Sequence, residues 1–148
     1  MKAATSKQAQ SSRARKQPTG ANLSTRAPAQ LVKVVESGLK FDELEALRAE
    51  LDLPLEKLGE KLGIARATLH RRKLSGRLAP DESDRVVRFA RLLRQAEGVF
   101  GTVNRARQWL SFPQRGLGGV IPLDFARTEI GAREVENLLG AIEYGVYT

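Results

Sequence analysis

One stretch, LEKLGEKLGIARATLHRRKLSG at residues 55–76, constrains the fold more than any other part of the sequence. It predicts two short helices joined by a tight turn at Gly63, because glycine readily adopts the positive φ that such a turn requires. Gly59, one helical turn earlier, would let the second helix approach the first closely. The two helices would share an apolar wedge made of Leu58, Leu62, Ile64 and Leu69. This part of the chain therefore predicts a helix-turn-helix.

The second helix of this pair has a basic outer face. If Leu69 points inward, the rotation of about 100° per residue turns Ala67 and Arg71 nearly opposite to it. In helix-turn-helix proteins this face reads the major groove, where Arg, His, Thr and Ala all find partners on base edges. The predicted DNA-binding residues are Arg66, Ala67, Thr68, His70 and Arg71 on this face, with Arg72, Lys73 and Arg77 better suited to phosphates. A plain helical hairpin with a merely solvated basic face is the alternative.

The overall charge favours a nucleic-acid partner for one end of the chain only. The 148 residues carry a net charge of +8 and have a pI near 10.3, and such a balance is typical of nucleic-acid binders, although membrane surfaces and acidic partners also attract it. Residues 116–148 contain five acids and two bases, a net charge of −3, which leaves +11 for residues 1–115. We therefore expect the two ends to meet different partners.

Composition also limits the compartment and the chemistry. Without Cys there is neither a disulfide nor a Cys-based metal site, and a reducing interior is the natural compartment. No apolar run approaches the roughly 18 residues that a membrane span needs, and MKAATSKQAQ lacks the apolar stretch of a secretory signal. We expect a cytoplasmic protein, associated with the nucleoid when bound to DNA, with no membrane partner, no metal and no cofactor.

Helical patterns follow one another along the chain, and the fold class they predict is all-α. Asp81 is the expected N-cap of a long helix that begins at Pro80 and Asp81. Gly38 is placed to close a short first helix in a left-handed conformation, and Gly119–Ile121 is the one strand candidate. The remaining helices are expected at residues 41–51, 55–62, about 102–110 and about 131–142.

Three regions follow from these patterns. Residues 1–28 contain six bases and no acid, with too little apolar surface to offset the entropy of ordering, and are expected to form a flexible basic arm. A solvated tail, an arm that contacts phosphates and an organelle transit peptide remain open, and the segment lacks the amphipathic face of a membrane-surface helix. Residues 29–98 are the expected helix-turn-helix domain, and residues 99–148 a second, small helical domain.

The last five residues are unusually rich in aromatic side chains for a solvated tail. Both tyrosines, Tyr144 and Tyr147, lie within the last five residues, and aromatic side chains supply large contact areas at low entropic cost. This ending predicts a protein-binding segment. The alternative is that Tyr144 and Val146 fold back to close the core.

Residues 118–146 closely resemble the toxin-binding domain of Xre/ParS-type antitoxins, which are paired with toxins of the RES family. The matching residues are Leu117-Gly118-Gly119, Pro122-Leu123-Asp124, Thr128, Gly131-Ala132, Val135, Leu138-Leu139-Gly140, Ile142 and Gly145-Val146. The helix-turn-helix half also resembles this family, through Thr68-Leu69 and Arg71-Arg72, so the resemblance covers about residues 35–148. One departure is Arg72, at a position that is often apolar in the family. Its side chain must either snorkel past the core edge or mark a shorter recognition helix.

The resemblance implies a function with two halves. The protein would bind operator DNA as a homodimer or higher assembly, repress its own operon, and bind and block a RES-family toxin that consumes NAD. The expected toxin-binding residues, which would cover the mouth of the toxin's active site, are Glu143, Tyr144, Gly145, Val146, Tyr147 and Thr148. The alternative is a stand-alone Xre-type repressor whose C-terminal domain serves dimerisation or effector sensing.

An enzyme is the weakest interpretation. His70 is the single histidine and has no carboxylate pair beside it in a pocket-like context. The loop RGLGG at residues 115–119 lacks the GKS/T ending and the preceding strand of a phosphate-binding loop.

Overall fold

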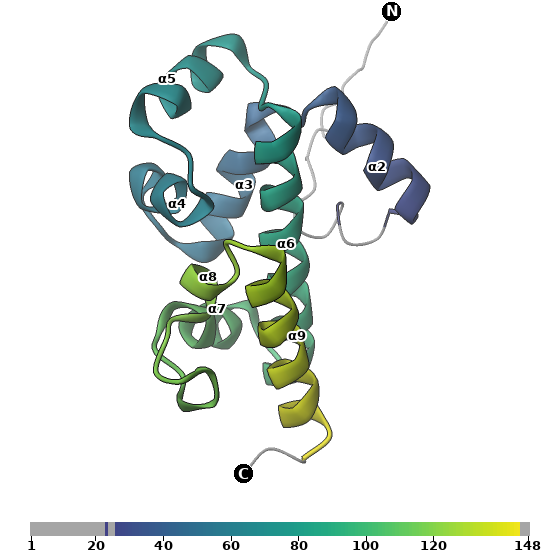
Figure 1. Cartoon of the computed structure of the whole chain (residues 1–148), viewed down its shortest axis with the longest axis vertical. Helices are drawn as coiled ribbons and strands as arrows, with labels where there is room; N and C mark the ends of the chain where they lie inside the picture. The colour runs from purple at the N-terminus through teal and green to yellow at the C-terminus, as the bar shows by residue number, and fades with distance from the viewer. Residues whose placement is uncertain (1–22, 24–25, 146–148) are drawn as a thin grey trace, which may run out of the picture.

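The computed structural model describes residue 23 and residues 26–145, and every regular element within them is helical (Figure 1). This confirms the predicted all-α class. The elements are α2 (Pro28–Ser37), α3 (Phe41–Leu51), α4 (Leu55–Leu62), α5 (Arg66–Ser75), α6 (Pro80–Phe100), α7 (Val103–Ser111), the 3-10 helix η2 (Arg115–Leu117), α8 (Pro122–Phe125) and α9 (Glu129–Glu143).

Helix α6 is the central support of the molecule. Helices α2, α3 and α4 pack against it, and α7 and α9 cover its other half (Figure 1). Its residues Val86, Phe89, Ala90, Leu93 and Ala96 are all fully buried. Because these residues recur at helical spacing within this 21-residue helix, α6 presents one apolar stripe against which helices from both halves of the chain pack.

The hydrophobic core is continuous from α3 to α9. Helix α6 extends to Phe100, so it also runs through the expected domain boundary between residues 98 and 99. Leu23, which lies in the segment expected to be a basic arm, is fully buried in the same core. Residues 1–22 and 24–25 of that segment lie outside the described residues, so the flexible arm and the domain limits stay predictions.

Two glycines close helices as the sequence predicted, with one difference. Gly63 ends α4 in the left-handed conformation, with φ 76° and ψ 27°. Gly38 ends α2 with φ 87° but with ψ 126°, which is outside the left-handed helical region. A Cβ at Gly38 would collide with the carbonyl oxygen of Leu78, because the two segments run side by side there. Only glycine fits this crossing without a shift of the backbone.

The start of α6 differs from the prediction. Asp81 is not the N-cap: Ala79 takes that place and Pro80 is the first helical residue, a position that proline favours. The cap bond comes from Glu82 instead, whose Oε1 accepts a hydrogen bond from the Ala79 amide at 2.8 Å.

The C-terminal third has one helix more than the sequence predicted. The short α8 was missed, and α9 begins two residues early, with the Thr128 side chain accepting a bond from the Gly131 amide. The strand candidate Gly119–Ile121 reduces to a single antiparallel bridge between Gln114 and Val120.

Candidate nucleic-acid and protein interfaces

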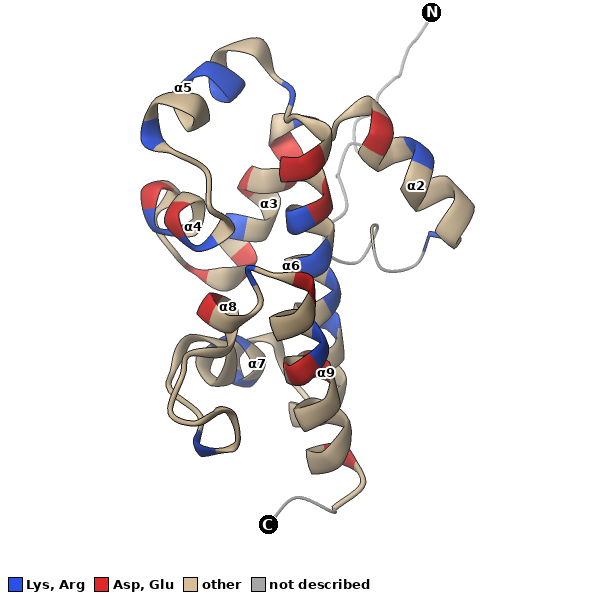
Figure 2. Cartoon of the chain, in the orientation of Figure 1, with Lys and Arg blue, Asp and Glu red and all other residues tan. Residues whose placement is uncertain are grey.

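The predicted orientation of α5 is confirmed. Leu69 is buried against the core, and the predicted outer residues Arg66, Ala67, His70, Arg71 and Lys73 are exposed, while Thr68 is partly exposed. Helix α5 lies at the edge of the molecule, and several positions along its ribbon are Lys or Arg (Figure 2). Whether these side chains contact DNA stays a prediction.

Helices α4 and α5 form a shallow groove of about 500 Å³ along this face. From α5, it is lined by Leu69 and by the predicted residues Arg66, Ala67, His70 and Lys73. These four predicted residues therefore face one side, and Arg71 lies outside the lining of the groove. Among the described residues, Arg66, Arg71 and Lys73 form no ion pair.

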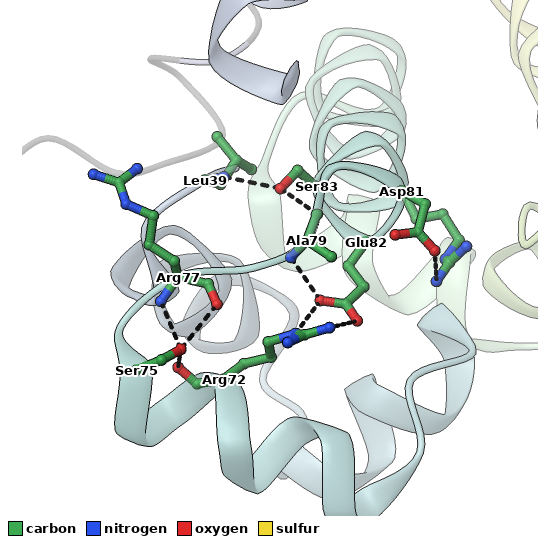
Figure 3. Close-up of polar contacts among 9 residues, drawn as sticks. Leu39, Arg72, Ser75, Arg77, Ala79, Asp81, Glu82 and Ser83 are labelled. Atoms are coloured by element: carbon green, nitrogen blue, oxygen red, sulfur yellow. Dashed lines mark hydrogen bonds and ion pairs between the residues drawn. The ribbon is translucent and has the colours of Figure 1, made fainter. Parts of the chain in front are cut away.

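Arg72 points the other way, toward the start of α6 (Figure 3). Its Nε donates to Oε1 of Glu82 at 2.8 Å and its terminal nitrogen donates to Oε2 at 3.0 Å. Glu82 is nearly buried, with 8% of its side chain exposed. Helix α5 continues three residues beyond Arg72 to Ser75, so the alternative of a shorter recognition helix is wrong.

The Arg72–Glu82 pair is held in its ionised form. Burial by itself would raise the pKa of Glu82, but the hydrogen bonds from Arg72 and from the Ala79 amide outweigh burial, and the pKa lies below its ordinary value. The same bond to Glu82 raises the pKa of Arg72. One carboxylate thus caps α6 and anchors α5.

Arg77 also has a partner within the protein. One of its guanidinium nitrogens donates to the carbonyl of Gly38 at 2.8 Å. Beside it, the Leu78 amide bonds the Leu39 carbonyl at 2.9 Å, and Ser83 Oγ accepts from the Leu39 amide at 2.8 Å (Figure 3). These bonds tie the end of α5 to the segment that precedes α3, so Arg77 has a structural role that its charge alone does not suggest.

The arginines of α6 are largely neutralised. Arg85 pairs with Asp81 at 3.8 Å and Arg88 with Asp84 at 3.0 Å, and in both pairs the partners are four residues apart on the helix. Arg91 is exposed and forms no ion pair with any described residue.

The end of α9 is open to solvent. Tyr144 is 81% exposed, and Glu143 and Gly145 are exposed beside it. The alternative that Tyr144 closes the core is therefore wrong. Val146, Tyr147 and Thr148 lie outside the described residues, so the remainder of the predicted toxin-binding segment stays a prediction.

Sequence reasoning missed two polar groups with structural importance. Glu82 stands three residues after its cap position, as in a capping box, but Ala79 replaces the Ser or Thr that signals one. Arg127 contacts residues more than 60 positions away, which no local pattern reveals.

The described residues show neither a metal centre nor a membrane helix. Within residues 23 and 26–145, no three His, Asp or Glu side chains lie close enough together to hold a metal ion. None of the helices in that part of the chain is both long and apolar enough to cross a membrane.

In comparisons with known proteins, each half of the chain matches a domain family. Residues 30–91 match the antitoxin Xre-like helix-turn-helix domain, and residues 95–145 match the antitoxin Xre/MbcA/ParS C-terminal toxin-binding domain. Antitoxin Xre of Yersinia enterocolitica is 34% identical over 120 residues, which cover 80% of this chain and 81% of the relative. Antitoxin Xre of Photorhabdus laumondii is 44% identical over 72 residues, 48% of this chain and 49% of the relative. A Sphingobium protein named Prs ADP-ribosylating antitoxin is 25% identical over 131 residues, 82% of each chain.

Proposed function

This chain belongs to the Xre antitoxins of toxin–antitoxin systems, and from that premise we propose that it neutralises a RES-family toxin that consumes NAD and represses its own operon. One observation carries the proposal. A toxin-binding domain and a helix-turn-helix with an unpaired cationic outer face share a single core.

The DNA-binding half of the proposal rests on α5. Arg71 is exposed and free of ion pairs within the described residues, so its guanidinium is available for a bidentate bond to guanine. Lys73 lies in the groove between α4 and α5 and suits a phosphate. Arg72 and Arg77 contribute less directly, because their guanidinium groups already bind Glu82 and the Gly38 carbonyl.

The protein assembles as a homodimer or higher oligomer in this proposal, because helix-turn-helix proteins commonly read two half-sites with two copies. Operator binding would place it at the nucleoid, in the cytoplasm. The toxin would be bound by the opposite, acidic end of the chain.

The toxin-binding half rests on the open end of α9. Sites that handle a dinucleotide tend to be basic, and Glu143 beside the exposed Tyr144 offers both negative charge and an apolar ring to such a site. The name of the Sphingobium relative combines an antitoxin with ADP-ribosylation, a reaction that draws ADP-ribose from NAD. This agrees with a partner that uses NAD.

Coexpression with the product of the adjacent gene, followed by a growth test, tests the proposal. The full chain should restore growth, and a variant that ends before Tyr144 should not, because it lacks the segment proposed to cover the toxin's active-site mouth. The same truncated variant should keep its affinity for the operator in a gel shift, since α5 is intact. Continued neutralisation by the truncation would overturn the role of the tail. An adjacent product that is neither toxic nor bound would favour a stand-alone repressor.

A further inference from the structure

An arginine from the C-terminal half holds the turn of the helix-turn-helix. Arg127, in the loop between α8 and α9, donates from its terminal nitrogen to the carbonyl of Glu60 at 2.9 Å. Its Nε donates to the carbonyl of Lys61 at 3.3 Å. Both carbonyls belong to the last turn of α4, where the Glu60 carbonyl also accepts a bond from the Gly63 amide at 3.0 Å. The guanidinium therefore caps α4 from outside the helix-turn-helix.

The stem of Arg127 also lies beside the turn residue Gly63, which is itself exposed. A Cβ at Gly63 would lie 3.6 Å from Cδ of Arg127, which is ordinary contact distance. Gly63 ends α4 three positions before α5 begins. The Arg127 side chain thus lies directly over the turn that sets the angle between the two helices.

Two further contacts fix this arrangement. Lys61 Nζ pairs with Oδ1 of Asp124 at 2.8 Å, and only 17% of the Lys61 side chain is exposed. Arg88 of α6 donates to the carbonyl of Arg127 at 2.7 Å. The loop that carries Arg127 is therefore held by α4 on one side and by α6 on the other.

We propose that Arg127 is a positioning residue for operator recognition, supplied by the toxin-binding domain. Helix α5 packs chiefly against α4, so fixing the end of α4 fixes the angle at which Arg66, His70 and Arg71 meet the major groove of the operator. This inference rests on the proposed binding of operator DNA. It also gives the domain at residues 95–145 a physical connection to the DNA-reading helix.

The test compares Arg127→Ala with a matched loss of charge, Arg133→Ala. Arg133 also lies in the C-terminal domain, but its side chain is 68% exposed and pairs only with Glu129 among the described residues. Affinities of both variants for the promoter and for a random duplex of equal length are measured at two salt concentrations, at a temperature where thermal unfolding shows each variant folded.

We expect Arg127→Ala to lower promoter affinity about tenfold. Its affinity for the random duplex should equal that of Arg133→Ala, because the change alters the position of α5 rather than a direct charge contact with DNA. Arg127→Lys, which can still donate to one carbonyl, should recover part of the preference for the promoter. A variant that destabilises the fold without moving α5 would not change the ratio of the two affinities.

Two results would overturn the inference. One is an Arg127→Ala variant that behaves like Arg133→Ala, and the other is an equal loss on both duplexes with a shallower salt dependence, which indicates a direct phosphate contact. If Arg127→Ala does not fold, Asp124→Ala replaces it. This change removes the carboxylate that accepts from Lys61 Nζ and should reduce promoter preference about threefold, and an unchanged preference would contradict the inference. A wild type without promoter preference would instead overturn the proposed function itself.

Discussion

Helices α5 and α6 are both rich in arginine, but their arginines differ in what they contact. Arg85, Arg88 and Arg94 of α6 pair with carboxylates of the same chain, and among the described residues only Arg91 of the α6 arginines does not. The first turn of α6 contains acids, whereas the first turn of α5 contains none and begins with Arg66, at the helix end where a cation is unfavourable. Arg66 and Arg71 of α5 thus carry charges with no ion pair among the described residues, which is expected of a surface that meets an anionic partner.

Arg72 is the exception that sharpens this comparison. It sits in the cationic helix but behaves like the arginines of α6, because Glu82 binds it in bidentate fashion. Adjacent residues of one helix therefore have different roles. Arg71 faces outward, and Arg72 holds the helix against α6 through Glu82. The two should respond to mutation in different assays.

The largest effect is expected for Arg71→Ala. Loss of a bidentate bond to guanine should weaken operator binding by about 1–3 kcal/mol and relax the preference at one base pair. Gel shifts with the operator and with single-base variants measure both. As a control, Arg85→Ala removes an equal charge that is already paired with Asp81, and a comparable loss of operator affinity there would contradict the difference between α5 and α6.

Glu82→Gln should lower the free energy of unfolding by about 1–2 kcal/mol at neutral pH, since it removes the charge from a buried hydrogen-bonded pair. Because the pKa of Glu82 is lowered in the folded state, its contribution is present above the ordinary pKa of glutamate and is lost as pH falls through the folded-state value. Denaturant unfolding of both proteins from pH 7 down to about pH 3 checks this. A difference that does not shrink in acid would contradict the ionised pair.

Lys73→Ala should weaken binding to all sequences alike and reduce the salt slope by about one, because a phosphate contact carries no sequence information. Affinities at several salt concentrations, on the operator and on a random duplex, provide the measurement. A loss confined to the operator would show that Lys73 reads a base instead.

The smallest effect is expected for Asp81→Asn. Its pair with Arg85 is 3.8 Å long and Asp81 is 73% exposed, so the free energy of unfolding should change by about 0.5 kcal/mol or less. Thermal unfolding of Asp81→Asn and of Glu82→Gln, measured side by side, compares an exposed acid with a buried acid in the same helix turn. Equal destabilisation by both changes would mean that burial does not distinguish them.

Local patterns predicted most of the helices. The apolar spacing located α3 and α4 at their observed bounds, and the inward position of Leu69 followed from the wedge it shares with Leu58 and Leu62. These features depend on residues within a few helical turns of one another. The sequence alone is sufficient for such short-range patterns.

What the sequence did not reveal depends on contacts between distant residues. Glu82 replaces Asp81 at the start of α6 because it bonds both the Ala79 amide and Arg72, and the second bond exists only once α5 is folded against α6. Arg127 reaches α4 across more than 60 residues. Neither contact leaves a periodic signal, so the charge of Arg72 or Arg127 could be noted from the sequence but not its partner.

Selective binding of DNA by the folded chain is the property that the proposed operator recognition requires. We predict that its affinity for its own promoter exceeds that for a random duplex of equal length by at least about 10³-fold at physiological ionic strength. Equal affinity for both duplexes would contradict the central claim, because the unpaired charges of α5 would then bind phosphates without reading sequence.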